Sequence, residues 1–462
     1  METQPESTFD SLSSKVGTFS ARDKTFLIPL MNRIGCHLLA AVFQAFGVRA
    51  RVMDTYRGMD LGREFTSGKE CFPCQVTTGD ILQFLEEERE RLGEAFNTDD
   101  YIYFMPEAGG PCRFGMYNKF QRIVLDSLPD LQNLKIGSLT SDNAYSPAGM
   151  IEKEKTTDFR KAAYLSVVIG DILDRLLWRI RPYEREPGLA DSLIDEALTA
   201  LSDAFLRHGA NKEFDAILDR LEDFVRKGKD LMDPDIPRKP LIGIVGEIYL
   251  RTHTQSNQDV IRVLERYGAE VVNASIAEWV NYTAYDRMRE ARLGLTRSLR
   301  LFRIREVRGH LSKILSYGTN LLYQQKKQDN AYRRMKPILD LPADHRVRDL
   351  EKVLIEKDLF SFDVGTEACL SVSGIMEYMR EGFNGVVNVY PFTCMPSTIT
   401  SAIVRPIVNR YRLPYLDTAY DGTFQPGREA AIRTFMYQAQ QHKERAIKNG
   451  RHREAQPRLA FL

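Results

Sequence analysis

Residues 25–53 read TFLIPLMNRIGCHLLAAVFQAFGVRARVM. The short apolar run Thr25–Leu30 has β character, and Cys36–Phe46 carries apolar residues at helical spacing. Gly47 ends that helix, and Val48–Met53 predicts a second strand. A strand, a helix and a strand in this order predict two parallel strands joined by a crossover helix.

The same alternation continues through the first third of the chain. The further elements that it predicts are a helix near Thr78–Leu92 capped by Thr77 or Thr78, a strand at Tyr101–Met105, a helix around Met116–Leu128 and a strand at Leu134–Leu139. This βαβαβ pattern indicates a parallel sheet covered by helices. We therefore expect a Rossmann-like domain at residues 25–150, preceded by a loosely ordered N-terminal arm at 1–24.

The alternation returns in the second half, after a helical segment expected at residues 151–235. The elements predicted there are strands at Leu241–Val245, Glu270–Asn273, Gly385–Val389 and Pro414–Leu416, and helices at Ser256–Tyr267, Glu367–Gly382, from Ser397 and at Arg428–His442. We expect a second Rossmann-like domain at 236–445, with a helical insertion near 280–350, and a basic tail at 446–462. The predicted fold class is α/β, with two parallel-sheet domains flanking a cleft.

Charge and composition narrow the partners that we expect. Lys and Arg number 64 and Asp and Glu number 63, so the formal net charge is +1. This balance supplies no field that would attract nucleic acid or an anionic membrane. The polar N-terminus is unlike a secretory signal, and no apolar run is long enough to span a bilayer. We expect a cytoplasmic protein, in which six reduced cysteines are metal-binding, catalytic or simply buried.

The six cysteines take similar positions in the predicted fold. Each lies in a loop or a helix start that follows a strand: Cys36, Cys71, Cys74, Cys112, Cys369 and Cys394. Ligands of parallel sheets bind outside the carboxyl ends of the strands, where these loops gather. The pattern favours one shared site over six unrelated core thiols, which is the plainer interpretation.

Three kinds of site compete for these cysteines. Structural zinc commonly uses two paired CxxC or Cys/His knuckles, and this chain has one CxxC. Cys71-Phe72-Pro73-Cys74 is similar to the C-x-P-C of dithiol oxidoreductases, but Gln75–Thr77 separates it from the predicted helix start. An iron–sulfur cluster accepts thiolates spread widely along a chain and suits a protected cleft. It is the best physical fit.

The residues beside the cysteines are compatible with a cluster. Glycines stand on both sides of Cys112 in GGPCRFG, so backbone amides can approach cluster sulfides closely. Lys69 and Arg113 place positive charge near two of the thiols, which would raise the reduction potential of an anionic cluster. Each is about equally well explained as an ordinary surface charge.

Four segments resemble a known superfamily. They are SGKECFPCQVTTGDIL (67–82), GGPCRFGMYN (109–118), VGEIYLR (245–251) with LERYGAEVV (264–272), and NGVVNVYPFTCMPSTI (384–399). From Phe26 to Gln440 the chain resembles the 2-hydroxyacyl-CoA dehydratase/benzoyl-CoA reductase superfamily. Within it, the chain is most similar to the acyl-CoA dehydratase activase-related branch, which includes double-cubane cluster proteins.

This resemblance implies a low-potential cluster between Rossmann-like domains, in a homodimer or heterodimer. It implies that Cys71 in GKEC, Cys112 in GPCRFG and Cys394 in PFTCMP are ligands. A double-cubane 8Fe–9S cluster would use all six cysteines, the other three being Cys36, Cys74 and Cys369. A single 4Fe–4S cluster on three cysteines is the alternative. The resemblance also implies a partner ATPase of the actin-like fold that delivers electrons by ATP hydrolysis.

Two further residues are candidates for catalysis. Glu247 ends a predicted strand, where it could hydrogen-bond a substrate, although a plain ion pair with Arg251 explains it equally well. His37 beside Cys36 could relay a proton, and a histidine without that role is the commoner case at a helix start.

Three functions remain open from the sequence. The first is an iron–sulfur reductase component that accepts electrons from the activator and reduces a small-molecule substrate. The second is a non-catalytic electron-transfer subunit of a dehydratase-like complex, and the third is a CoA- or nucleotide-binding protein with structural cysteines. Neither GxGxxG nor a Walker A sequence occurs, so ATP hydrolysis is assigned to the partner.

Overall fold

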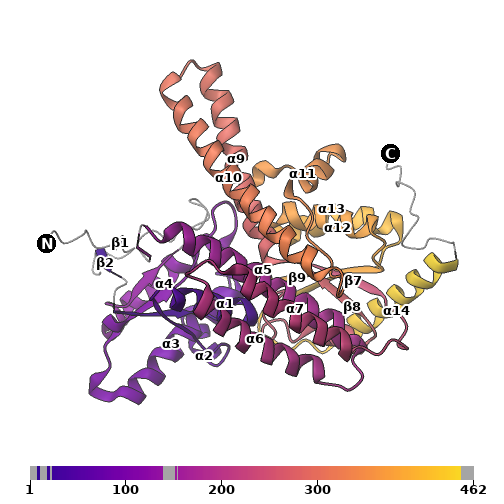
Figure 1. Cartoon of the computed structure of the whole chain (residues 1–462), viewed down its shortest axis with the longest axis horizontal. Coiled ribbons are helices and arrows are strands. Elements are labelled where there is room, and N and C mark those ends of the chain that lie inside the picture. The colour runs from indigo at the N-terminus through magenta and orange to yellow at the C-terminus, as the bar shows by residue number, and fades with distance from the viewer. Residues whose placement is uncertain (1–7, 11–17, 21–22, 139–150, 153, 449–462) are drawn as a thin grey trace. The chain divides into compact units, whose positions relative to one another are not determined.

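The computed structural model describes residues 8–10, 18–20, 23–138, 151–152 and 154–448 (Figure 1). In these residues two four-stranded parallel sheets lie among helices, which confirms the α/β class. In the described ranges, no helix combines the length and the apolar character that crossing a bilayer requires.

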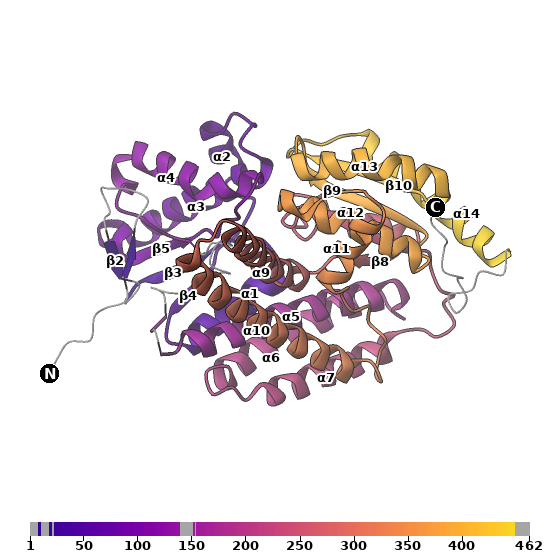
Figure 2. The same cartoon turned by 90° about the horizontal axis from the view of Figure 1, so that it is seen from above.

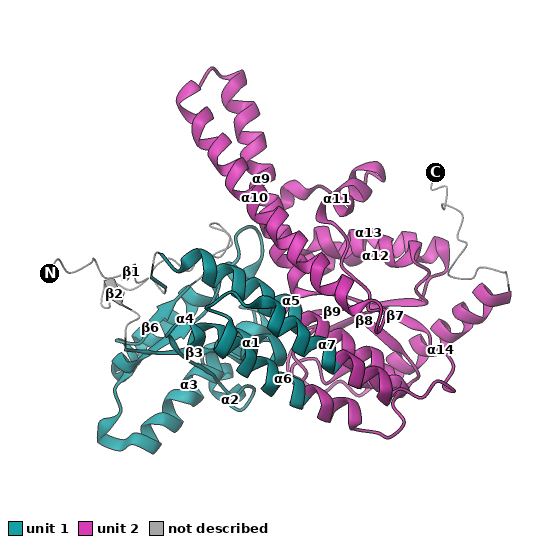
Figure 3. Ribbon diagram, in the orientation of Figure 1, with its two compact units in different colours: residues 1–170, 195–224 teal, residues 171–194, 225–462 magenta. Residues whose placement is uncertain are grey.

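The chain forms two compact units (Figure 3). Unit 1 consists of residues 1–170 and 195–224, and unit 2 consists of residues 171–194 and 225–462. The helical segment expected at 151–235 is thus divided between the units. Its helices are α5 (Thr156–Ile180), α6 (Leu189–His208) and α7 (Phe214–Leu231).

The sheet of unit 1 has the strand order β4-β3-β5-β6. Its strands are β3 (Thr25–Ile28), β4 (Arg49–Val52), β5 (Tyr101–Phe104) and β6 (Lys135–Gly137). The connecting helices are α1 (Arg33–Ala45), α3 (Phe72–Leu92) and α4 (Tyr117–Ser127). Apart from the start of α3, these bounds lie within three residues of the expected ones.

The sheet of unit 2 has the order β10-β9-β7-β8. Its strands are β7 (Leu241–Gly246), β8 (Glu270–Asn273), β9 (Gly385–Pro391) and β10 (Tyr415–Tyr420). The helices on it are α8 (Val260–Arg266), α12 (Glu367–Arg380), α13 (Met395–Tyr411) and α14 (Gly427–Lys448) (Figure 2). Two glycines let helices approach both faces: a Cβ on Gly243 would lie 2.4 Å from the ring of Tyr378, and one on Gly385 would lie 2.7 Å from Phe435.

Several elements differ from the expectation. The insertion is an antiparallel hairpin of α9 (Ile276–Arg300) and α10 (Ile304–Met335), which extends away from the sheet of unit 2 (Figure 1). The sequence patterns missed α2 (Met59–Phe65) and α11 (Val347–Glu356). In the N-terminal arm, β1 (Thr8–Asp10) pairs with β2 (Thr18–Ser20). Of the basic tail, only the end of α14 lies within the described residues.

The expected start of α3 was wrong by six residues. The helix begins at Phe72 instead of Thr78, with Cys71 as its N-cap and Pro73 in its first turn, a position that proline favours. Close backbone contact holds this helix against α2. A Cβ on Gly79 would lie 2.0 Å from the carbonyl oxygen of Gly58, and one on Gly62 would lie 2.2 Å from that of Gln75.

This contact predicts the effect of adding one methyl group. Gly79→Ala should lower the free energy of unfolding by about 2–3 kcal/mol, because the obstructing atom is backbone and cannot rotate away. Gly309→Ala is the matched control, since nothing lies within 4 Å of the Cβ that this substitution would add on α10. Urea denaturation of both variants measures the difference, and equal stability of the two would contradict the packing described.

Candidate functional site

The two sheets have the same topology. When the strands of each sheet are numbered by their order in the chain, both sheets read 2-1-3-4. Strands 1 and 3 are neighbours in each sheet, and their connections leave in opposite directions. In open parallel sheets, the carboxyl ends at such a switch point are where ligands bind.

Cys112 and Cys394 occupy equivalent positions in the two units. Cys112 follows β5, the third strand of unit 1, and is the N-cap of a short 3-10 helix at Arg113–Met116. Cys394 follows β9, the third strand of unit 2, and is the N-cap of α13. Left-handed backbone precedes both, with φ of 80° at Gly110 and 66° at Thr393. For Thr393 this conformation costs energy, which is typical of functional loops.

Cys71 lies in a strained loop that is bonded to the loop of Cys112. Its φ is 99°, an outlier for a residue with a Cβ, and it is 7% exposed. The guanidinium of Arg113, next to Cys112, donates a hydrogen bond to the carbonyl oxygen of Lys69 at 2.5 Å. This bond joins the two loops, so unit 1 holds two of the three expected core ligands in adjacent segments.

Cys74 lies in the first turn of α3, fully buried. Burial raises the pKa of its thiol well above the ordinary range, and the Cys71 and Glu70 charges add to this, while Thr78 and Arg113 act in the opposite direction. The CFPC motif therefore starts a helix. The separation from a helix start that counted against a dithiol function is absent in the structure.

Cys36 and His37 lie in the first part of α1, whose N-cap is Asn32. The Cys36 thiol donates to the carbonyl oxygen of Pro29 at 3.4 Å, and burial raises its pKa. The Nδ1 of His37 lies 2.8 Å from the carbonyl oxygen of Arg33 on the same helix. That bond leaves Nε2 as the nitrogen able to relay a proton, and the catalytic role of His37 stays a prediction.

Unit 2 gathers two carboxyls around Cys394. Burial raises the pKa of the Cys394 thiol to about 12, with Glu367 and Glu247 adding to the shift. Burial also raises the pKa of Glu247 to about 7, with Glu367 as the next cause, and raises the pKa of Glu367. Glu367 thus disfavours ionisation of both Glu247 and Cys394.

Glu247 is held by backbone bonds. Its carboxylate accepts hydrogen bonds from the amides of Tyr249 at 3.1 Å and Leu250 at 2.8 Å. Arg251 donates instead to the carbonyl oxygens of Gly246 and Ser275, so the described residues show no direct pair between Glu247 and Arg251. The carboxylate is therefore fixed at the carboxyl end of β7.

Glu367 was not among the candidate residues from the sequence. It is the first residue of α12, directly after the N-cap Thr366, and it is 7% exposed. A buried acid is unusual, but sequence spacing does not report burial at a helix start, where acids are common. Its position two residues before the candidate ligand Cys369 could have identified Glu367 as a site residue.

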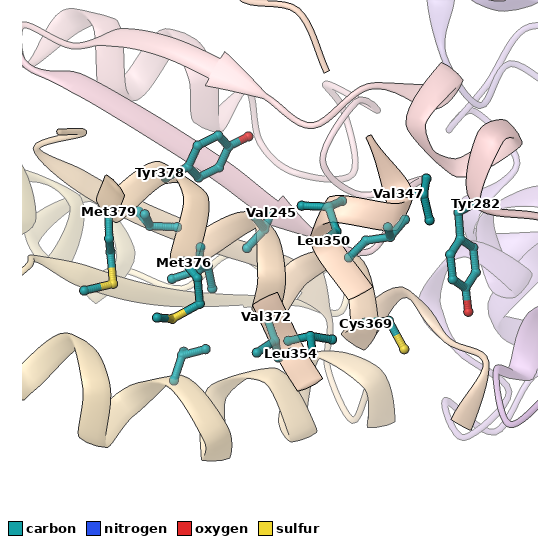
Figure 4. Packing of buried hydrophobic residues seen from close by; sticks show 14 of the residues in the cluster. Val245, Tyr282, Val347, Leu350, Leu354, Cys369, Val372, Met376, Tyr378 and Met379 are labelled. Atoms are coloured by element: carbon teal, nitrogen blue, oxygen red, sulfur yellow. The ribbon is translucent and has the colours of Figure 1, made fainter. Parts of the chain in front are cut away.

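Cys369 belongs to the hydrophobic core of unit 2 (Figure 4). It is fully buried among Val372, Leu370 and Tyr282, and its thiol lies 3.7 Å from the carbonyl oxygen of Ser361. Burial raises the pKa of this thiol to about 11. Cys71 and Cys74 belong to the hydrophobic core of unit 1 in the same way, so core burial does not set Cys369 apart from them.

The six cysteine thiols are the kind of ligand that an iron–sulfur cluster requires. All six cysteines are thiols, and the three core candidates lie in loops at the carboxyl ends of strands or at a helix start. Soft thiolates are the ligands that such clusters need, and a cluster would offset the cost of ionising buried thiols. Within the described residues, no group of three His, Cys, Asp or Glu side chains is placed to hold a metal ion.

Comparison with known proteins adds no assignment. No protein-family model matches the chain, and no curated protein matches it.

The raised pKa of Glu247 predicts how stability depends on pH. Its pKa is about 7 in the folded metal-free chain, above the ordinary 4.5. The stabilising contribution of the protonated acid is therefore complete below the ordinary pKa and is lost as pH rises through about 7. Relative to Glu247→Gln, wild type should lose up to about 3 kcal/mol of unfolding free energy between about pH 4 and about pH 8.

Chemical denaturation at a series of pH values measures this difference. The exposed Glu94→Gln serves as control and should leave the pH profile of wild type unchanged. Parallel profiles for wild type and Glu247→Gln would show that Glu247 ionises normally in the folded chain.

Proposed function

We propose that this chain is an iron–sulfur protein in which Cys71, Cys112 and Cys394 ligate one 4Fe–4S cluster. The observation that carries the proposal is the equivalence of Cys112 and Cys394, each following the third strand of a sheet with the order 2-1-3-4. The hydrogen bond from Arg113 to Lys69 links the loop of Cys71 to the loop of Cys112, and Cys71 is therefore the third proposed ligand. Unit 1 supplies two of these proposed ligands and unit 2 supplies one.

The proposed role is that of a reductase component. The cluster would supply a low-potential one-electron carrier. The resemblance of the motifs implies that the electron comes from a separate ATPase of the actin-like fold. This sequence has no phosphate-binding motif, which agrees with ATP hydrolysis by a partner protein. The substrate would be a small molecule, and the resemblance to the 2-hydroxyacyl-CoA dehydratase/benzoyl-CoA reductase superfamily supports an acyl thioester.

The protein groups beside Cys394 suit a reduction that consumes protons. Glu247 is half-buried and Glu367 is buried, and the pKa values of both carboxyls are raised, so they hold protons at a pH where exposed carboxylates have lost them. The amides of Tyr249 and Leu250 fix the carboxyl group of Glu247. In this proposal Glu247 donates a proton to the substrate and Glu367 maintains the pKa of Glu247.

A single cluster is better supported than a double cubane. Six cysteine ligands would require Cys369, whose thiol lies 3.7 Å from the carbonyl oxygen of Ser361. They would also require Cys36, whose thiol donates to Pro29. Cys74, one turn into α3 from Cys71, is the best placed of the three additional thiols.

One observation favours a second candidate function. Cys71-Phe72-Pro73-Cys74 begins α3, as the active motif of a dithiol oxidoreductase begins a helix. The two thiols would then exchange with a substrate disulfide. The burial of both residues and the strongly raised pKa of Cys74 count against rapid exchange.

Iron analysis of cysteine variants tests the proposal. After anaerobic reconstitution, wild type should hold about four irons and four sulfides per chain, against about eight irons for a double cubane. Cys112→Ser and Cys394→Ser should each lose most of this iron together with the visible absorbance, because each removes one ligand. Cys369→Ser is the matched control in the same unit as Cys394 and should retain it.

Two results would reject the cluster. One is full iron content in both Cys112→Ser and Cys394→Ser, and the other is a wild-type chain that binds no iron at all. If instead air oxidation of iron-free wild type removes two reactive thiols and Cys74→Ser prevents this, the dithiol function is supported.

A further inference from the structure

The α9–α10 hairpin exposes large apolar side chains along much of its length. They are Leu293, Leu299, Leu301, Phe302, Ile304, Leu311, Leu315 and Leu322, with exposed fractions between 51% and 87%. Isolated exposed leucines are ordinary on a protein surface, but eight on one hairpin form a group. Exposed apolar groups of this size are typical of interaction sites.

Four of these residues form a single line on α10. Ile304, Leu311, Leu315 and Leu322 follow one another at intervals of seven, four and seven residues. This spacing keeps them on one side of a helix over about 27 Å, at a rise of about 1.5 Å per residue. A narrow apolar line of this kind is the seam with which one helix packs against another.

The residues around this line are cationic. Between Arg292 and Lys313 the chain has seven arginines and lysines and one carboxylate, Glu306. Glu306 is already engaged, with Ser298 at 2.8 Å and Arg303 at 3.4 Å. In the part of the chain that the structure describes, Arg297, Arg300, Arg305 and Arg308 have no ion-pair partner.

Contacts along the α9–α10 hairpin fix the position of its two helices. At its tip Phe302 is 87% exposed and has a φ of 55°, a strained conformation for a bulky side chain. The two helices approach closely where a Cβ on Gly294 would lie 2.4 Å from the ring of His310. At the base, Asn281 donates to Gln328 at 2.9 Å, and both side chains are buried.

The geometry points to a partner protein that presents an acidic amphipathic helix along α10. A second copy of this chain is disfavoured because two hairpins with the same strong positive charge would repel each other. An anionic bilayer would accept the tip, but the apolar line continues down α10 to Leu322, away from Phe302. Only a partner that lies alongside the helix covers the whole line. This inference does not depend on the proposed cluster.

A designed peptide serves as the probe. It has about three heptads, with Leu at the a and d positions and Glu at e and g, and its twin carries Lys in place of Glu. The full-length chain should bind the Glu peptide and not the Lys peptide, as measured by fluorescence anisotropy. Leu311→Glu combined with Leu315→Glu should weaken binding by at least about tenfold. Arg305→Glu combined with Arg308→Glu should shift the preference toward the Lys peptide.

The matched control is Ile355→Glu on α11, where the isoleucine is 68% exposed and lies off the hairpin. It should bind the Glu peptide as wild type does, and circular dichroism should show all variants equally folded. Equal binding of both peptides, or unchanged binding by the Leu311 and Leu315 variant, overturns the inference. So does a wild-type dimer that this variant converts to monomer, which assigns the surface to a second copy. Cosedimentation of wild type, but not the variant, with phosphatidylglycerol vesicles assigns it to a membrane and overturns it equally.

Discussion

All strands of each four-stranded sheet run in the same direction, and this constraint governs where chemistry can occur in the molecule. A parallel sheet requires every connection to return along a face, so each strand delivers its carboxyl end to one edge. The loops that leave this edge carry Cys112 in unit 1, and Glu247 and Cys394 in unit 2. The strained backbone at Cys71 and Thr393 lets the chain turn directly from such loops into a helix.

Cys394 and Glu367 are buried and Glu247 is half-buried, although the ionised forms of these groups favour water. Burying an ionised thiolate or carboxylate without a cationic partner costs several kcal/mol, and folding avoids that cost by keeping these groups protonated. In unit 2 this holds for Glu247, Glu367 and Cys394 together. The proposed cluster would reverse the balance for the thiol, because the metal would stabilise the thiolate, and its binding would then release a proton.

Much of the fold follows from the sequence. Its strands are short apolar runs, and the segments between them carry apolar residues at helical spacing. The start of α3 does not follow from the sequence, because Cys71 caps it without a side-chain hydrogen bond and so leaves no capping signature. The place of Cys369 at the start of a helix follows from the sequence, but its complete burial does not, because residue spacing does not report burial. The exposed line on α10 is similarly invisible, because a helix repeats its apolar residues in the same way whether a core or a partner covers them.

The division of the chain into interleaved segments has a consequence for biosynthesis. Residues 195–224 complete unit 1 only after 171–194, which belong to unit 2, have been made. A chain emerging from the ribosome therefore cannot finish its first unit before residue 224, although both unit 1 cysteine loops are already present. During that interval Cys71 and Cys112 exist on an incomplete unit.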